Sequence, residues 1–92
     1  MKYKRSNSIV ERAIAGEHLL VPIRGEVADL RKLFALNESA KILWDALAEP
    51  TDEDHLVGLL LEKFRADEPT VRNDVRELLN EMVARKLVEA IP

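Results

Sequence analysis

The apolar pattern of this chain changes near Asn37, and that change limits the folds open to it. Before Asn37, apolar and polar residues alternate in segments such as IVERAI, which is typical of β-strands. After it, apolar residues recur at helical spacing in segments such as ESAKILWDAL, which is typical of amphipathic helices. The sequence therefore predicts strands first and helices second.

The strand-like part predicts an antiparallel sheet. The segment IVERAIAGEHLLVPIRG predicts a β-hairpin that turns at Gly16 and Glu17. Pro22 cannot donate a backbone hydrogen bond, so an edge or a bulge is expected at the end of the second strand. A further turn is expected at residues 24–26, and the β-prone stretch from Lys32 to Leu36 is expected to form a third strand.

The helix-like part predicts three helices, because each begins with a residue that can cap free backbone N–H groups. Asn37 is a good N-cap for the first helix. Thr51 with Asp54 resembles a capping box at the start of the second helix. The third helix is expected to open at Asp67, with Pro69 in its first turn. The closing segment LVEAI predicts one short terminal strand.

These elements together predict an α+β fold: an N-terminal three-stranded antiparallel sheet, three helices and a short terminal strand. They are the ingredients of a winged helix-turn-helix. The first eight residues, MKYKRSNS, are polar and charged and are expected to be disordered. Residues 9–92 are then expected to form a single domain with one modest core and little room for a deep active-site cleft.

The composition argues against several classes of function. The chain has no cysteine, which excludes disulfides and thiolate chemistry and fits a reducing cytoplasm. No apolar run approaches the ~18 residues that a membrane span needs. His18 and His55 lie far apart in the sequence and do not predict a metal site, and no glycine-rich phosphate loop is present. We therefore expect a cytoplasmic protein that is not an enzyme and needs neither cofactor nor metal.

Nucleic-acid binding has weak support in the sequence. The net charge is −3, whereas affinity for phosphate groups comes largely from Lys and Arg. Arg72, Arg76 and Arg85 in the third predicted helix form a candidate DNA-reading face. Acidic residues interleave with them, which favours a solvent-exposed face with salt bridges.

The third predicted strand is the more informative candidate site. Unless it is covered, one long side of the strand from Lys32 to Leu36 has unpaired N–H and C=O groups, and such an edge can accept an extended peptide as a further strand. A protected edge that binds nothing is the alternative. Trp44, the sole tryptophan, shares helical spacing with Ala40 and Leu47 and is expected in the core.

The segment from Ile9 to Ile91 resembles the family of coenzyme PQQ synthesis protein D, the PqqD-like peptide-recognition domains. The resemblance lies in the hairpin, followed by LFALNESAKILWDAL, TDEDHLVGLLLEKF and DVRELLNEMVARKLVEAI in that order. This chain departs from the family at Ala40, at residues 49–50 and at Lys86, which are turn or cap positions where the family often has glycine.

The resemblance implies a groove between the third strand and the third helix that binds the leader of a ribosomally made precursor peptide. It implies that the leader adds antiparallel to the strand from Arg31 to Leu36, with the helix from Thr70 to Arg85 as the opposite wall. The peptide-binding residues expected on this basis are Arg31, Lys32, Leu33, Phe34, Ala35, Leu36, Arg72, Val75, Arg76 and Leu79.

We therefore expect a non-catalytic peptide chaperone that presents a leader to a modifying enzyme, often a radical S-adenosylmethionine maturase in this family, on the way to PQQ or another peptide-derived product. The chain is expected to act as a monomer or homodimer, without nucleic acid or membrane as a partner. Two alternatives remain open: a DNA-binding winged-helix regulator, and a structural subunit of an enzyme complex.

Overall fold

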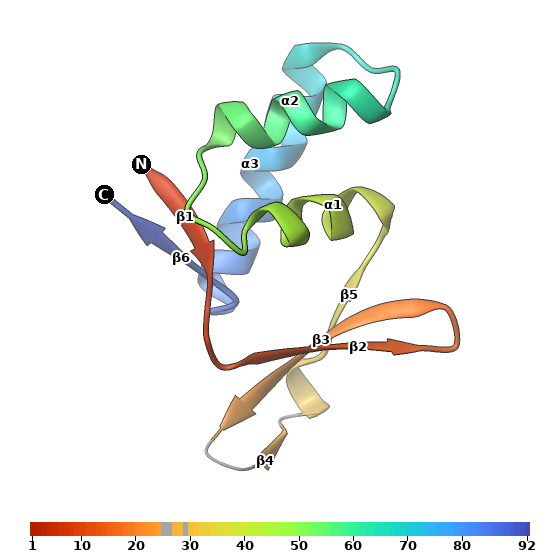
Figure 1. Ribbon diagram of the computed structural model, residues 1–92, viewed down its shortest axis with the longest axis vertical. Coiled ribbons are helices and arrows are strands. Elements are labelled where there is room, and N and C mark those ends of the chain that lie inside the picture. Colours follow the sequence, from red (N-terminus) through yellow and green to blue (C-terminus); the bar gives the residue numbers. More distant parts are fainter. Residues whose placement is uncertain (25–26, 29) are drawn as a thin grey trace.

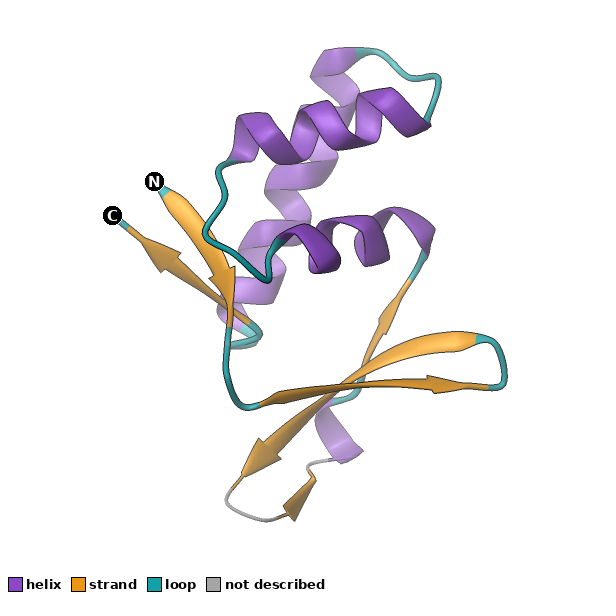
Figure 2. Cartoon of the chain, in the orientation of Figure 1, coloured by secondary structure: helices purple, strands orange, loops and turns teal. Residues whose placement is uncertain are grey.

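The helices gather on one side of the molecule and the larger sheet lies on the other (Figure 1, Figure 2). The structure is a computed structural model that describes residues 1–24, 27–28 and 30–92. The strands are β1 (Lys2–Arg5), β2 (Ile9–Ile14), β3 (Glu17–Arg24), β4 (Val27–Ala28), β5 (Phe34–Leu36) and β6 (Val88–Ile91). The helices are α1 (Glu38–Ala46), α2 (Glu53–Lys63) and α3 (Glu68–Ala84), with a 3₁₀ turn η1 (Leu30–Lys32) before β5.

Strand β3 is the centre of the larger sheet. It pairs with β2 along one edge, and with both β4 and β5 along the other, always antiparallel. Strands β1 and β6 form a separate antiparallel pair beside the helices (Figure 1). The described elements confirm the predicted α+β class, with antiparallel strands before the helices and a short terminal strand after them.

The hairpin turns one residue earlier than the sequence predicted. Ile14 pairs with Glu17, so Glu17 already belongs to β3 and the loop consists of Ala15 and Gly16. Both loop residues have positive φ, 52° and 82°, as a two-residue turn requires if it is to match the twist of the strands. The turn predicted at residues 24–26 includes Gly25 and Glu26, which lie outside the described residues.

The third predicted strand is shorter than the stretch from Lys32 to Leu36. A continuous ladder beyond the Ile23–Ala28 pair would place Arg31 opposite Leu20, but Phe34 stands there, so the register has shifted by three residues. The turn η1 contains that number of residues, and it removes Arg31 and Lys32 from the strand. Pro22, whose nitrogen has no hydrogen to donate, lies at this interruption.

The expectation of a disordered N-terminus is wrong for residues 2–5, which form β1. The Tyr3 N–H donates to the Thr51 carbonyl at 2.7 Å, and the Arg5 N–H donates to the Leu47 carbonyl at 2.9 Å. The other edge of β1 pairs with β6, and the Arg5 guanidinium lies 5.2 Å above the Trp44 ring. The polar composition of these residues gave no sign of a strand, because the segments that pair with β1 lie far away in the sequence.

Two of the three predicted helix caps are confirmed. The side chains of Asn37 and Asp67 accept hydrogen bonds from the N–H groups of Ala40 and Thr70. The predicted capping role of Thr51 is wrong, because Asp52 caps α2 and Thr51 is instead buried against β1. Pairing with the Tyr3 backbone therefore determines the conformation of Thr51.

Helix α3 ends in a Schellman motif. The Leu87 N–H donates to the Met82 carbonyl at 2.9 Å, and the Lys86 N–H donates to the Val83 carbonyl at 3.0 Å. Lys86 has φ 61°, the left-handed conformation that favours glycine. Leu87 and Met82 are both fully buried, which supplies the hydrophobic contact that accompanies this motif.

The core lies where the three described α-helices meet the sheet. Trp44 is 2% exposed, which confirms its predicted packing role. Leu20 of β3 and Leu36 of β5 are the residues that these two strands contribute to the core cluster. The helices contribute most of the remaining buried side chains, which are Ala40, Leu43, Leu56, Val57, Leu60, Val71, Val75, Leu79 and Met82.

Candidate functional site

The outer edge of β5 presents backbone groups that its only described neighbour strand does not use. The Ile23 N–H donates to the Ser8 carbonyl, which fixes the N–H groups at odd-numbered positions of β3 toward β2. The even-numbered positions therefore face β5, and the Leu20–Phe34 and His18–Leu36 pairs share hydrogen bonds. Ala35, between them, directs its N–H and C=O away from β3.

One side of α3 lies along this edge. The Arg85 guanidinium, at the end of the helix, lies 5.2 Å from the centre of the Phe34 ring, which is a cation–π contact. Asp74, in the first half of the helix, lines a pocket with the residues that follow β5. Leu78 and Glu81 lie between these two at helical spacing, so Asp74, Leu78, Glu81 and Arg85 share a face.

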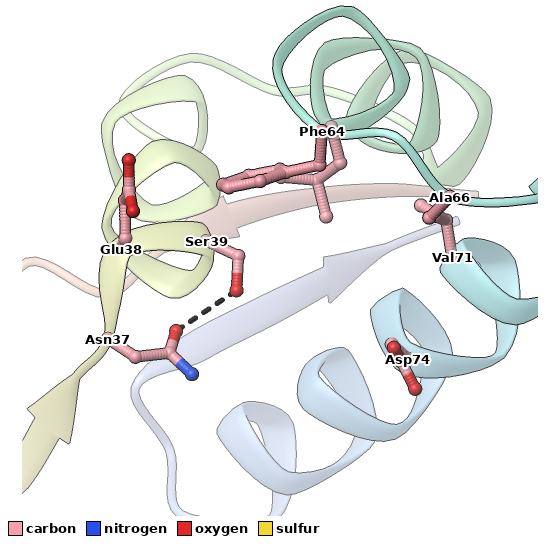
Figure 3. A pocket seen from close by; sticks show the side chains of 8 residues that line it. Asn37, Glu38, Ser39, Phe64, Ala66, Val71 and Asp74 are labelled. Atoms are coloured by element: carbon pink, nitrogen blue, oxygen red, sulfur yellow. Dashed lines mark hydrogen bonds between the residues drawn. The ribbon is translucent and has the colours of Figure 1, made fainter.

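The first pocket in this region lies at the start of α1 (Figure 3). Its volume is about 330 Å³, and the Phe64 side chain reaches into it from the end of α2. The Ser39 hydroxyl donates to the Asn37 side chain at 3.1 Å on its rim. Its described lining residues are Asn37, Glu38, Ser39, Leu60, Phe64, Ala66, Val71 and Asp74.

A second pocket lies at the opposite end of β5. It has a volume of about 270 Å³, and its described lining residues are Lys32, Ala84 and Arg85. Lys32 closely precedes β5, whereas Asn37 of the first pocket directly follows β5. The two pockets therefore lie beyond the two ends of β5, and we call the surface between them the groove, with β5 on one side and the Asp74–Arg85 face of α3 on the other.

The structure does not bring Arg72 and Arg76 to this groove. Arg72 donates to Glu53 and Asp54 at 2.7 Å and to Glu68 at 2.8 Å, and Arg76 donates to Glu53 at 2.7 Å. Both arginines thus lie on the side of α3 that faces the start of α2. Helical spacing places Arg72 about half a turn from Glu81, on the opposite side of the helix.

These contacts shift the pKa values of Glu53, Arg72 and Arg76. Hydrogen bonds from Arg76 and Arg72 lower the pKa of the Glu53 carboxyl below its usual 4.5. The carboxylates around Arg72, led by Glu68, raise the pKa of that guanidinium, and Glu53 raises the pKa of Arg76. The network is an ion-paired contact between α2 and α3, as the mixed charges of the sequence indicated for this helix.

The other predicted site residues differ in how far they are exposed to solvent. Val75 and Leu79 are 0% and 1% exposed, so they support the groove from within the core. Leu36 is also buried, Phe34 is half-buried under Arg85, and Ala35 is exposed. The exposed residues before the strand are Arg31, Lys32 and Leu33.

Sequence reasoning missed the residues that line the first pocket. The apolar spacing of α2 indicates only packing for Phe64, although this side chain is half-buried and reaches into the pocket. Asp74 is one of the acidic residues that interleave with the arginines of α3, and the mixed charges alone do not single it out. The spacing of Asp74, Leu78, Glu81 and Arg85 was the available signal, but nothing in the sequence indicates which side of α3 lies against β5.

Neither a metal-binding cluster nor a membrane-spanning helix occurs in the part of the chain that the structure describes. Within it, no group of three or more His, Cys, Asp or Glu side chains is placed to hold a metal ion. No described helix has both the length and the apolar character needed to cross a membrane.

Comparisons with known proteins agree with this fold. The solved structure of "TbiB1 in Complex with the TbiA(beta) Leader Peptide" matches with a TM-score of 0.77 and 24% sequence identity, covering 97% of this chain and 98% of that chain. No curated protein sequence matches. The model of the family described as coenzyme PQQ synthesis protein D matches residues 17–88, a span that contains β3, β5, all of α1, α2 and α3, and both pockets. The chain therefore belongs to the family of coenzyme PQQ synthesis protein D.

Proposed function

We propose that this chain binds the leader of a ribosomally made precursor peptide as an additional strand on β5 and presents it, without catalysis, to a modifying enzyme. The observation that carries the proposal is the outward-facing backbone of Ala35, which lies between two pockets and opposite α3. Family membership and the likeness to a leader-bound protein support it.

The groove favours an extended peptide over other ligands. A peptide antiparallel to β5 exchanges backbone hydrogen bonds with Ala35 and continues the antiparallel pattern of the sheet. Every second side chain of the peptide then points toward the protein, and the apolar surfaces of Phe64 and Val71 can receive one of them. Backbone pairing and apolar contact supply most of the affinity, because exposed ion pairs contribute only about 0–1 kcal/mol each.

The test uses two alanines on opposite edges of the same sheet. Ala35→Pro removes the outward N–H of β5 without touching the β3 pairing, so it should abolish leader binding. Ala13→Pro is the matched control, because Ala13 faces outward from the free edge of β2 by the same alternation. Binding is measured by fluorescence anisotropy with the leader of the precursor peptide encoded beside this chain.

Circular dichroism of both proline variants should show folded protein. Equal leader binding by the Ala35→Pro variant and the unmodified chain would rule out strand addition at β5. Loss of binding in both variants would point to a general defect of the sheet instead of a site at β5.

The partner enzyme belongs to the same proposal. We infer a maturase, of the radical S-adenosylmethionine type that the family often serves, as the protein that receives the bound leader. A pull-down with the maturase encoded nearby should recover more enzyme when leader is present. Recovery that does not depend on leader would favour the structural-subunit alternative.

A further inference from the structure

Charged side chains of opposite sign mark the two ends of the groove. Among the described residues, the pocket at the start of α1 is lined by two carboxylates, Glu38 and Asp74, and by no basic side chain. The pocket at the end of α3 is lined by Lys32 and Arg85 and, within the same limits, by no acidic side chain. The groove is therefore electrically asymmetric along β5.

Neighbouring charges reduce this asymmetry without reversing it. The N-terminus of α1 contributes about half a positive charge beside Glu38, which is less than the charge of two carboxylates. At the other end, Glu81 pairs with Arg85 at 3.2 Å and α3 contributes about half a negative charge. Among the described residues, Lys32 from the opposite wall of the groove leaves that end with a net positive charge.

We infer that the groove selects leaders by the order of their charges: a basic residue N-terminal to the apolar segment that lies along β5, and an acidic residue C-terminal to it. The inference rests on the proposed function, because antiparallel addition determines which end of the peptide meets which pocket. The N-terminal half of such a peptide lies beside Asn37, near Glu38 and Asp74, and its C-terminal half lies beside Lys32 and Arg85.

The order of charges should change the affinity for the peptide measurably. Backbone pairing and apolar contact should still supply most of that affinity. Each exposed pair changes the dissociation constant by up to about fivefold, so losing both pairs when the two peptide charges are exchanged should weaken binding by up to about 25-fold. The difference should shrink in ~1 M salt, where the screening length falls to about 3 Å.

The experiment selects random peptides of about twelve residues, displayed as fusions, on the immobilised full chain. Lys and Arg should be enriched N-terminal to an apolar residue, and Asp and Glu C-terminal to it. The Arg85→Glu variant should lose the downstream acidic preference. The Arg12→Glu variant carries the same charge reversal on the exposed side of β2 and should select the same peptides as the unmodified chain.

The outcomes separate the inference from the proposed function. Selected peptides with no charge order, or with the opposite order, would overturn the inference and leave strand addition intact if the Ala35→Pro variant fails to bind them. A charge order that survives Arg85→Glu would also overturn it. Peptides that bind the Ala35→Pro variant equally, or no enrichment over a surface without protein, would overturn the proposed function itself.

Discussion

Lys86 occupies a backbone conformation that suits glycine better than lysine. Its φ of 61° brings Cβ close to its own backbone, and for a residue other than glycine this conformation costs about 1 kcal/mol. We expect Lys86→Gly to raise the free energy of unfolding by about 1 kcal/mol, measured by urea denaturation. Lys86→Ala keeps the Cβ atom and is the control, so an equal gain in both variants would contradict this account.

The ionisation of Glu53 should make the stability of the folded chain depend on pH in the acidic range. Its pKa is lowered in the folded state by Arg76 and Arg72, so the folded chain binds fewer protons than the unfolded chain near the usual value of 4.5. The stabilisation is therefore complete above pH 4.5 and is lost as the pH falls through the lower, folded-state value. Thermal unfolding from neutral to acidic pH should show this loss in the unmodified chain.

The Glu53→Gln variant should be less stable than the unmodified chain at neutral pH, and the difference should narrow below pH 4.5. Glu62→Gln, at an exposed position of the same helix, is the control and should leave the pH profile unchanged. A constant difference between Glu53→Gln and the unmodified chain at all pH values would show that the Arg72 and Arg76 contacts do not act through this ionisation.

Single residues with a local signal were predictable from the sequence. Asn37 and Asp67 were identified as caps because a cap acts on the N–H groups three residues away. Thr51 was misread because its conformation depends on Tyr3, far away in the sequence. The sequence also contained no signal for the partner of Arg85, since its contact with Phe34 depends on how α3 crosses the sheet.

At the scale of elements, β1 is the strand whose role is most testable. The N–H groups of Tyr3 and Arg5 donate to the segment between α1 and α2, while β6 pairs along the other edge. Amide hydrogen exchange should therefore be slow at Tyr3 and Arg5, because both must break a hydrogen bond before they exchange. Exchange at the rate of an unstructured peptide, measured by NMR, would contradict the strand.

Strand β5 illustrates a limit of predicting elements from the sequence. Its β-prone residues were recognised, but the limit at Phe34 depends on the register that β3 imposes after the Ile23–Ala28 pair. Residues 31 and 32 have side chains compatible with a strand, yet they belong to the turn η1, which takes up the three-residue shift in register between the two ladders. The position of this strand in the sequence was therefore predicted correctly, whereas its predicted length was wrong.

At the scale of the whole molecule, the sequence predicted the family and the order of strands and helices, apart from β1, β4 and the turn η1. The spacing of apolar residues carries that information, because buried residues recur at every second position in a strand and at every third or fourth position in a helix. The groove was predicted only in outline. Its lining depends on the rotation of α3 about its axis, which places Asp74 and Arg85 beside β5 and directs Arg72 and Arg76 to Glu53.

The pairing of Lys2 with Ile91 makes the chain almost a closed ring, with both ends side by side (Figure 1). A circular permutant can join these ends with a short glycine-rich linker and open the chain between Ala15 and Gly16. It should fold and keep the groove, because neither the joined residues nor the residues at the new ends line the two pockets. Circular dichroism and leader binding test this, and an unfolded permutant would contradict it. The domain is thus suited to insertion within another protein as well as to fusion at one end.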